Sequence, residues 1–127
     1  MLADFGLPTS LTTALILVSR QGGKGIMQAE LAEEVGVNPG GMVRILDQAE
    51  SVGLLIRRDS SEDRRVKTVH VLPKGRELAS RMEEAIAELR ATLLGDLPAE
   101  DIEGATRLLR SFESRISEHL QRKRADR

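Results

Sequence analysis

The chain has 127 residues, enough for one domain with its own core, and its formal net charge of -1 gives no global basic signature. It contains no cysteine, which excludes disulfides and thiolate metal sites, and no apolar run of membrane-spanning length. Because the N-terminus also lacks the pattern of a signal peptide, we expect a cytoplasmic protein with no membrane partner. A role in nucleic-acid binding must therefore depend on local charge.

Three short helices are predicted in the first half of the chain. The first follows Ser10 as a candidate N-cap, the second spans about 28–35, and the third spans about 39–51 behind the N-cap Asn38. The apolar residues of the third helix that we expect to face the core are Met42, Val43, Leu46 and Ala49.

A β-hairpin is predicted after the third helix, followed by two longer helices. Segments 54–58 and 66–72 are rich in β-branched residues, and the polar segment 59–65 between them is typical of a turn. The helical period returns at Pro73 and continues, after a break at 95–98, in a last helix. The polar, basic end of the chain, "QRKRADR", is expected to fray.

The predicted fold is mainly α with a small β-hairpin, because three short helices followed by a hairpin form the winged helix-turn-helix plan. We assign 1–75 to a winged helix-turn-helix DNA-binding region and 76–127 to long C-terminal dimerisation helices, within a single structural domain. One chain cannot bury the apolar stripes of both last helices, so a homodimer is predicted. The expected dimer-interface residues are Leu97, Ile102, Leu109, Phe112 and Ile116.

Four motifs in this order carry a family resemblance: "ELAEEVGV", "ILDQAESVGLLIRR", "EDRR" and "VLPKGREL". With them, roughly residues 7 to 120 resemble the MarR family of bacterial transcriptional regulators. The resemblance implies a homodimeric repressor that binds a pseudo-palindromic site in double-stranded DNA and is released by a small-molecule effector. Family members usually begin with a further N-terminal helix; only about ten residues precede the first helix here, so we expect that helix to be missing or shortened.

The resemblance also assigns roles in the hairpin, which is the wing of such folds. The family's Asp-x-Arg pair falls on Asp63 and Arg65, and this pair would structure the wing. Arg64, between them, would point outward into the narrow minor groove of DNA, where the negative potential is high. Lys67 is a candidate phosphate contact, whereas Arg57 is expected to be structural or peripheral.

The third helix is the one that such folds place in the DNA major groove. Arg44 lies toward its exposed side, and arginine is the commonest reader of guanine. Gly40 and Gly41 each cost about 1 kcal/mol in a helix relative to Ala, but they remove side-chain bulk where N–H groups favour phosphate. We expect Asp47 and Glu50 to be turned from the DNA backbone. The predicted DNA-binding residues are Gln28, Asn38, Gly40, Gly41, Arg44, Arg64, Arg65 and Lys67.

Two other function classes remain as alternatives. One is a winged-helix interaction protein that no longer binds DNA and antagonises a related regulator; the glycines in the third helix favour it. An enzyme is not expected, because no nucleophilic or paired-carboxylate constellation is apparent and no catalytic residue can be named. His70 and His119 lack a second ligand at metal spacing, and "GGKG" (22–25) lacks the Walker pattern, so neither a metal nor a cofactor is expected.

Overall fold

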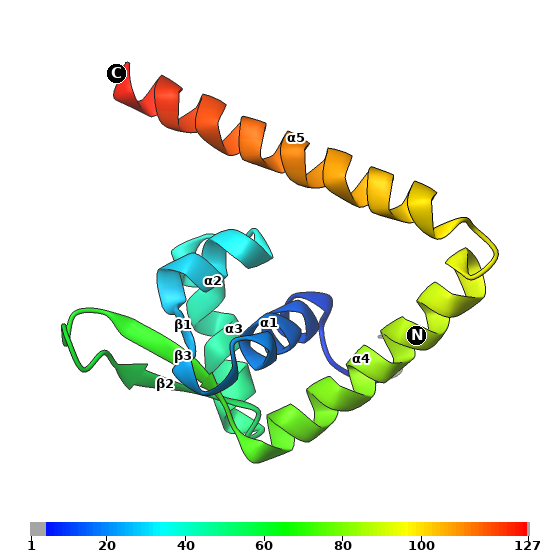
Figure 1. Cartoon of the computed structure of the whole chain (residues 1–127). Helices are drawn as coiled ribbons and strands as arrows, with labels where there is room; N and C mark the ends of the chain where they lie inside the picture. The colour runs from blue at the N-terminus through cyan, green and yellow to red at the C-terminus, as the bar shows by residue number, and fades with distance from the viewer. Residues whose placement is uncertain (1–4, 127) are drawn as a thin grey trace. The chain divides into compact units, whose positions relative to one another are not determined.

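The computed structural model describes residues 5–126, and the chain divides into two units, Met1–Leu89 and Arg90–Arg127. Figure 1 follows the elements in chain order. They are α1 (Thr9–Arg20), the 3-10 turn η2 (Gly22–Lys24), β1 (Ile26–Met27), α2 (Gln28–Val35), α3 (Pro39–Ser51), β2 (Leu55–Asp59), β3 (Lys67–Val71), α4 (Pro73–Leu94) and α5 (Ala99–Ala125).

The sheet of the first unit has three antiparallel strands in the order β1-β3-β2. Strands β2 and β3 form the predicted hairpin, with Leu55 opposite Val71 and Asp59 opposite Lys67. Strand β1 was not predicted, because a strand of two residues is too short to show an alternating pattern. It pairs with the other side of β3, where Ile26 lies opposite Val69, and so joins the start of α2 to the wing.

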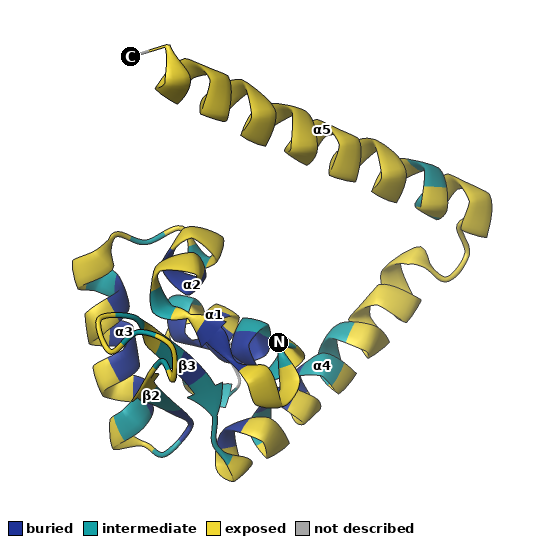
Figure 2. Cartoon of the chain, turned by 60° about the vertical axis from the view of Figure 1, so that its left-hand side comes forward, coloured by how far each residue is buried: buried dark blue, intermediate teal, exposed yellow. Residues whose placement is uncertain are grey.

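The core of the first unit lies between α1, α2, α3, the sheet and the first half of α4 (Figure 2). Its largest fully buried side chains are Leu11, Leu15, Val18, Leu31, Met42, Leu46, Leu54, Leu55, Val69 and Met82. Burying such a side chain contributes roughly 1.5 to 3 kcal/mol relative to leaving it exposed. This core fixes the positions of α3 and the wing relative to α1 and α2.

Helix α3 buries Met42, Leu46 and Ala49 as predicted, but the prediction for Val43 is wrong. The side chain of Val43 is 40% exposed, and Ile45 takes the remaining place in the core. Successive residues of an α-helix are about 100° apart, so a stripe through positions 42, 45, 46 and 49 turns position 43 toward solvent.

The ends of two helices also differ from the predictions. Helix α1 begins at Thr9 after Pro8, with no side-chain cap, so Ser10 lies inside the first turn and is not the N-cap. Helix α5 continues to Ala125, so the predicted fraying of the C-terminal segment is wrong within the described residues. Three basic residues in its last turn, Arg122, Lys123 and Arg124, interact favourably with the negative end of the helix dipole.

Helix α5 forms most of the second unit and has no buried residue. Its 27 residues are coloured as exposed almost throughout in Figure 2. No helix within residues 5–126 combines the length and the apolar composition that a bilayer span requires.

Candidate DNA interface

The turn between α2 and α3 is a tight reversal made by Gly36 and Val37. Gly36 has φ 83° and ψ 33°, a left-handed conformation that glycine adopts without steric cost. The backbone N–H groups of Gly36 and Val37 both donate to the Ala32 carbonyl, at 2.9 and 3.0 Å. Val37 then packs against the core, which anchors the chain immediately before α3 begins.

The first turn of α3 is capped and carries almost no side chain. Asn38 Oδ1 accepts a hydrogen bond from the Gly41 N–H at 2.7 Å, and Pro39 occupies the first helical position. A Cβ added at Gly40 would meet only Asn38 Oδ1, at 3.6 Å, so the surface there is open. Pro39 has no N–H group, and the N–H of Gly41 donates to the Asn38 cap. The N–H of Gly40 therefore remains as a donor in the first turn of α3.

The exposed face of α3 follows this bare turn. Arg44 is exposed, and its side chain makes no ion pair or hydrogen bond with another residue in the described part of the chain. Val43 is exposed beside it, although its predicted place is in the core. If Ile45 is included among the core residues, the 3.6-residue period predicts that Val43 is exposed.

Arg57, on β2, connects the wing to α3. Its Nε donates to Glu50 Oε1 at 2.9 Å and its Nη2 donates to Asp47 Oδ1 at 2.6 Å. Its backbone N–H donates to the same Glu50 oxygen at 2.9 Å. Both acidic residues therefore pair with Arg57, whose single positive charge is shared between the two carboxylates.

The contact between Arg57 and Glu50 shifts both groups. The hydrogen bonds from the Arg57 side chain and backbone hold the pKa of Glu50 below its usual value. The hydrogen bonds to Glu50 and then to Asp47 raise the pKa of Arg57 further above its ordinary value. Both groups are charged at neutral pH, which keeps the end of α3 fastened to the base of the wing.

The tip of the wing is braced by Asp63 and Arg65. Asp63 Oδ1 accepts from the backbone N–H of Arg65 at 3.0 Å and from its Nε at 3.2 Å. The backbone closes the loop, because the Val66 N–H donates to the Asp63 carbonyl at 3.0 Å. The hydrogen bond from the Arg65 side chain lowers the pKa of Asp63, so this brace is ionised at neutral pH.

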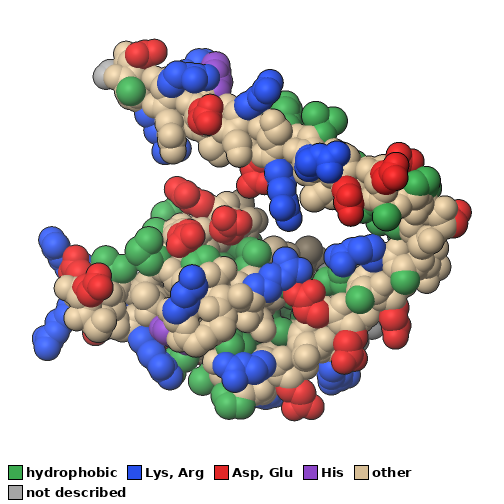
Figure 3. Space-filling view, viewed as in Figure 1, with side chains coloured by type: hydrophobic (Ala, Val, Ile, Leu, Met, Phe, Trp, Pro, Cys, Tyr) green, Lys and Arg blue, Asp and Glu red, His purple; other side chains and the backbone are tan. Residues whose placement is uncertain are grey.

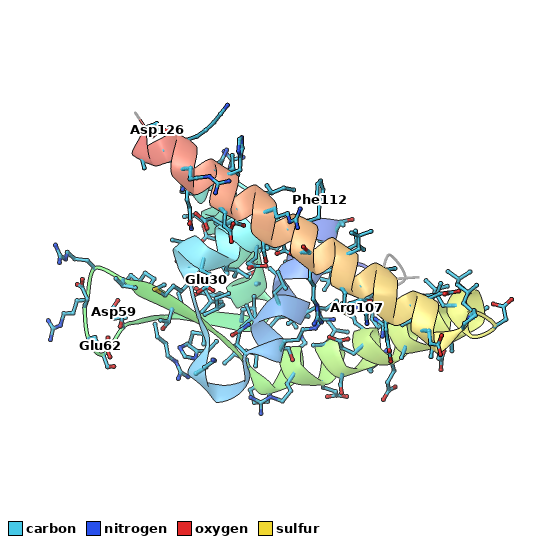
Figure 4. All side chains as sticks on the ribbon, turned by 45° about the horizontal axis from the view of Figure 1, so that its top comes forward. Glu30, Asp59, Glu62, Arg107, Phe112 and Asp126 are labelled. Carbon is cyan, nitrogen blue, oxygen red and sulfur yellow. The ribbon has the colours of Figure 1, made fainter. Side chains whose placement is uncertain are left out.

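Arg64 lies between the two braced residues and is exposed. It has no hydrogen-bond or ion-pair partner among residues 5–126, so its guanidinium is available to a ligand. Figure 3 shows Lys and Arg side chains at the outer end of the hairpin, and Figure 4 shows the acidic Asp59 and Glu62 on the same hairpin. The wing therefore carries both signs of charge.

Two other predicted DNA contacts are less available than Arg44 and Arg64, one because it is paired and the other because it is half-buried. Lys67 Nζ forms an ion pair with Asp59, its cross-strand neighbour, and about half of each side chain remains exposed. Gln28, at the start of α2, is half-buried, and its Oε1 is inaccessible to solvent and has no hydrogen-bond partner in the described residues. It lines a hollow of about 600 Å³ between the starts of α2 and α3 and residues 65–67 of the wing.

The predicted interface residues gather on α5 and just before it. Leu109, Phe112 and Ile116 are 67%, 62% and 45% exposed, and they repeat at a spacing of three and four residues along α5. Leu97 is 48% exposed, whereas Ile102 is half-buried. Phe112 can be found on α5 in Figure 4. The resulting apolar stripe is the kind of helix surface that another helix covers.

Neither histidine belongs to a metal-binding group. His70 Nε2 lies 2.9 Å from Thr68 Oγ1, and His119 is exposed on α5. No cluster of three or more His, Cys, Asp or Glu side chains with metal-binding geometry occurs within residues 5–126.

The capped, bare start of α3 beside a braced basic hairpin defines a winged helix-turn-helix protein, the class in which the second helix of the motif enters the DNA major groove. Residues 5–66 match the sequence model of the MarR family. The chain belongs to this family of DNA-binding transcriptional regulators, and its fold is that of the solved family members.

Three solved structures illustrate the similarity. The transcriptional regulator PA3341 is 28% identical, with 92% of this chain matched to 85% of that chain and a TM-score of 0.82. NadR in complex with 4-hydroxyphenylacetate is 19% identical over 87% of this chain and 78% of its own, with a TM-score of 0.78. MepR from S. aureus in a DNA complex is 20% identical over 89% and 82%, with a TM-score of 0.72.

Proposed function

We propose that the chain is a sequence-specific repressor that acts in the cytoplasm as a homodimer on a pseudo-palindromic operator. The observation that carries this proposal is that two exposed arginines, Arg44 on α3 and Arg64 on the wing, have side chains without a partner among residues 5–126. They occur together with a start of α3 that has no side-chain bulk at Gly40. Arg57, at the base of the wing, is tied to Glu50 instead.

The two free arginines have different roles. Arg44 lies one turn into the helix that enters the major groove, where a guanidinium reads guanine by two parallel hydrogen bonds. Arg64 extends from the wing tip, where it reaches the adjacent minor groove and responds to its width more than to its sequence. The Gly40 N–H and the positive end of the α3 dipole would receive a phosphate between these two contacts.

The proposed homodimer forms through the helical region 76–127, with Leu97, Ile102, Leu109, Phe112 and Ile116 at its interface. Two copies related by a twofold axis would place two α3 helices in successive major grooves, about 34 Å apart. MepR is a relative solved with DNA, and NadR is one solved with a small aromatic acid. These relatives support a DNA-bound form of this chain and release by a small-molecule effector.

The experiment is selection of DNA fragments from the source genome by the full chain, followed by gel shifts of a retained fragment over a range of salt. We expect specific binding with a steep salt dependence. Arg64→Ala should weaken binding and reduce the salt slope by about 1. Arg122→Ala, which removes an equally charged residue from the far end of α5, is the matched control and should leave binding unchanged.

The alternative, a winged-helix protein that no longer binds DNA and antagonises a related regulator, predicts a different result. In that case no fragment is retained even at low salt, and Arg64→Ala makes no difference. Such an outcome would contradict the proposed repressor.

A further inference from the structure

Val43 is an exposed apolar residue on the helix that faces DNA in this fold. Its side chain is 40% exposed and does not belong to the core or to the partly buried residues packed against it. A single exposed valine is ordinary on a protein surface. Its place is what distinguishes it: it is the first apolar side chain on the exposed face of α3 after the bare turn.

The bare turn determines what Val43 can reach. Valine has a short side chain, so its methyl groups contact a base only where the helix backbone comes close to the base edges. Gly40, one turn earlier, has no side chain, and a Cβ there would have nothing but the Asn38 cap oxygen within 4 Å. A helix that begins in this way can approach the floor of the groove more closely than one with side chains in its first turn.

The charged neighbours of Val43 on this part of α3 are Arg44, which follows it in the sequence, and Asp47. Asp47 is one turn further along the same side, and its carboxylate is bound to Arg57 at 2.6 Å. The base edges in the major groove offer hydrogen-bond donors and acceptors and one apolar group, the C5-methyl of thymine. Because a valine side chain has no polar atom, the thymine methyl is the only one of these groups that it can recognise.

We propose that Val43 is a specificity-determining residue that contacts the C5-methyl group of a thymine in the major groove, beside the base pair that Arg44 reads. The inference rests on the proposed function, and it adds the recognition of one thymine in each half-site of the operator. Its readout is apolar and does not depend on salt, unlike that of the arginines.

The test is a double-mutant cycle on a DNA fragment that the protein itself selects. Each thymine of one half-site is replaced in turn by deoxyuridine, which pairs identically and lacks only the methyl group. Affinities for these duplexes are measured for the wild-type chain, for Val43→Ala and for Val52→Ala. Val52 is a matched control, because it is 41% exposed and follows the opposite end of α3.

We expect one thymine position at which deoxyuridine weakens wild-type binding about fourfold, the loss that corresponds to one buried methyl-sized group. Val43→Ala should bind the thymine and deoxyuridine duplexes at that position equally, whereas Val52→Ala should retain the wild-type difference. Ala is a better helix former than Val, so the variant should fold.

Two results overturn the proposal in different ways. If the chain binds a specific site but no thymine is coupled to Val43, the inference is wrong and the proposed function stands. If the chain binds no DNA, or binds all sequences equally, the proposed function fails together with the inference.

Discussion

The roles of single residues in this protein follow from their partners more than from their type. Arg64 and Arg65 are adjacent and both are exposed, but Arg65 is held by Asp63 and Arg64 has no partner within residues 5–126. The same distinction separates Arg44, whose side chain has no partner among residues 5–126, from Arg57, which pairs with two carboxylates. The free arginines can exchange water for DNA without breaking an internal ion pair.

The buried hydroxyl of Thr12 has no hydrogen-bond partner among the described residues, and this gives a prediction about stability. Thr12 is 2% exposed, and its Oγ1 has no hydrogen-bond partner in the described residues. A buried hydroxyl without a partner costs roughly 1 to 3 kcal/mol. We therefore expect Thr12→Val to raise the free energy of unfolding by about 1 kcal/mol, measured by urea denaturation.

The neighbouring Thr13 supplies the control for this substitution. Thr13 is exposed, and its Oγ1 donates to the Thr9 carbonyl at 3.0 Å, so Thr13→Val should not stabilise the chain. Equal effects of the two substitutions would show that the buried hydroxyl of Thr12 carries no penalty.

At the scale of elements, α3 is positioned by the core on one side and by Arg57 on the other. The ion pair with Glu50 should be sensitive to acid, because the pKa of Glu50 is lowered in the folded protein. A lowered pKa contributes stability above the unfolded pKa of about 4.3 and loses it as the pH falls through the folded pKa.

We expect Glu50→Gln to destabilise the chain by about 1 kcal/mol at pH 7, an amount typical of a half-exposed charged hydrogen bond. The difference between wild type and variant should shrink as the pH falls below about 4, because the carboxyl of the unfolded chain takes up a proton there, and it should be lost once the pH is below the lowered pKa of the folded protein. Urea denaturation at a series of pH values measures this. A difference that stays constant down to pH 3 would contradict an ionic origin.

The bare first turn of α3 gives a second prediction at this scale. Gly40→Ala adds a Cβ that meets only Asn38 Oδ1, at 3.6 Å, so the folded state accommodates it. Stability should rise by up to about 1 kcal/mol, the difference in helix propensity, whereas DNA affinity should fall because the added methyl group lies where the helix approaches the groove. Gly104→Ala on α5, which is also unobstructed, is the control and should leave DNA affinity unchanged.

The sequence was sufficient for most of these elements and insufficient for their connections. Helices 28–35 and 39–51 and the hairpin could be predicted because apolar spacing, the Asn38 cap and the turn residues all agree. Strand β1 was missed because two residues have no measurable period. The contact of Arg57 with Asp47 and Glu50 joins side chains 7 and 10 positions apart on different elements, and no local pattern signals such a contact.

At the scale of the whole molecule, α5 is the feature that a single chain does not explain. It has 27 residues and none of them is buried, yet it carries Leu108, Leu109, Phe112, Ile116 and Leu120, each at least 45% exposed. An isolated helix with such a stripe gains little stability from itself and much from a partner helix. A second copy of the chain supplies an identical stripe, as a twofold interface requires.

Phe112→Glu places a charge in the middle of this stripe and should convert a dimer to a monomer. Sedimentation equilibrium at micromolar concentration measures the mass, and Ser114→Glu, on the opposite side of α5, is the matched control that should remain dimeric. In a dimer the two α3 helices are linked, so binding of one half-site raises the effective concentration of the second α3 helix at the other half-site. We therefore expect Phe112→Glu to lower operator affinity by about a hundredfold or more. Binding to an isolated half-site should be nearly unchanged, because α3 and the wing are intact. A wild-type chain that is monomeric at this concentration, or a Phe112→Glu variant that still dimerises, would contradict a dimer built on α5.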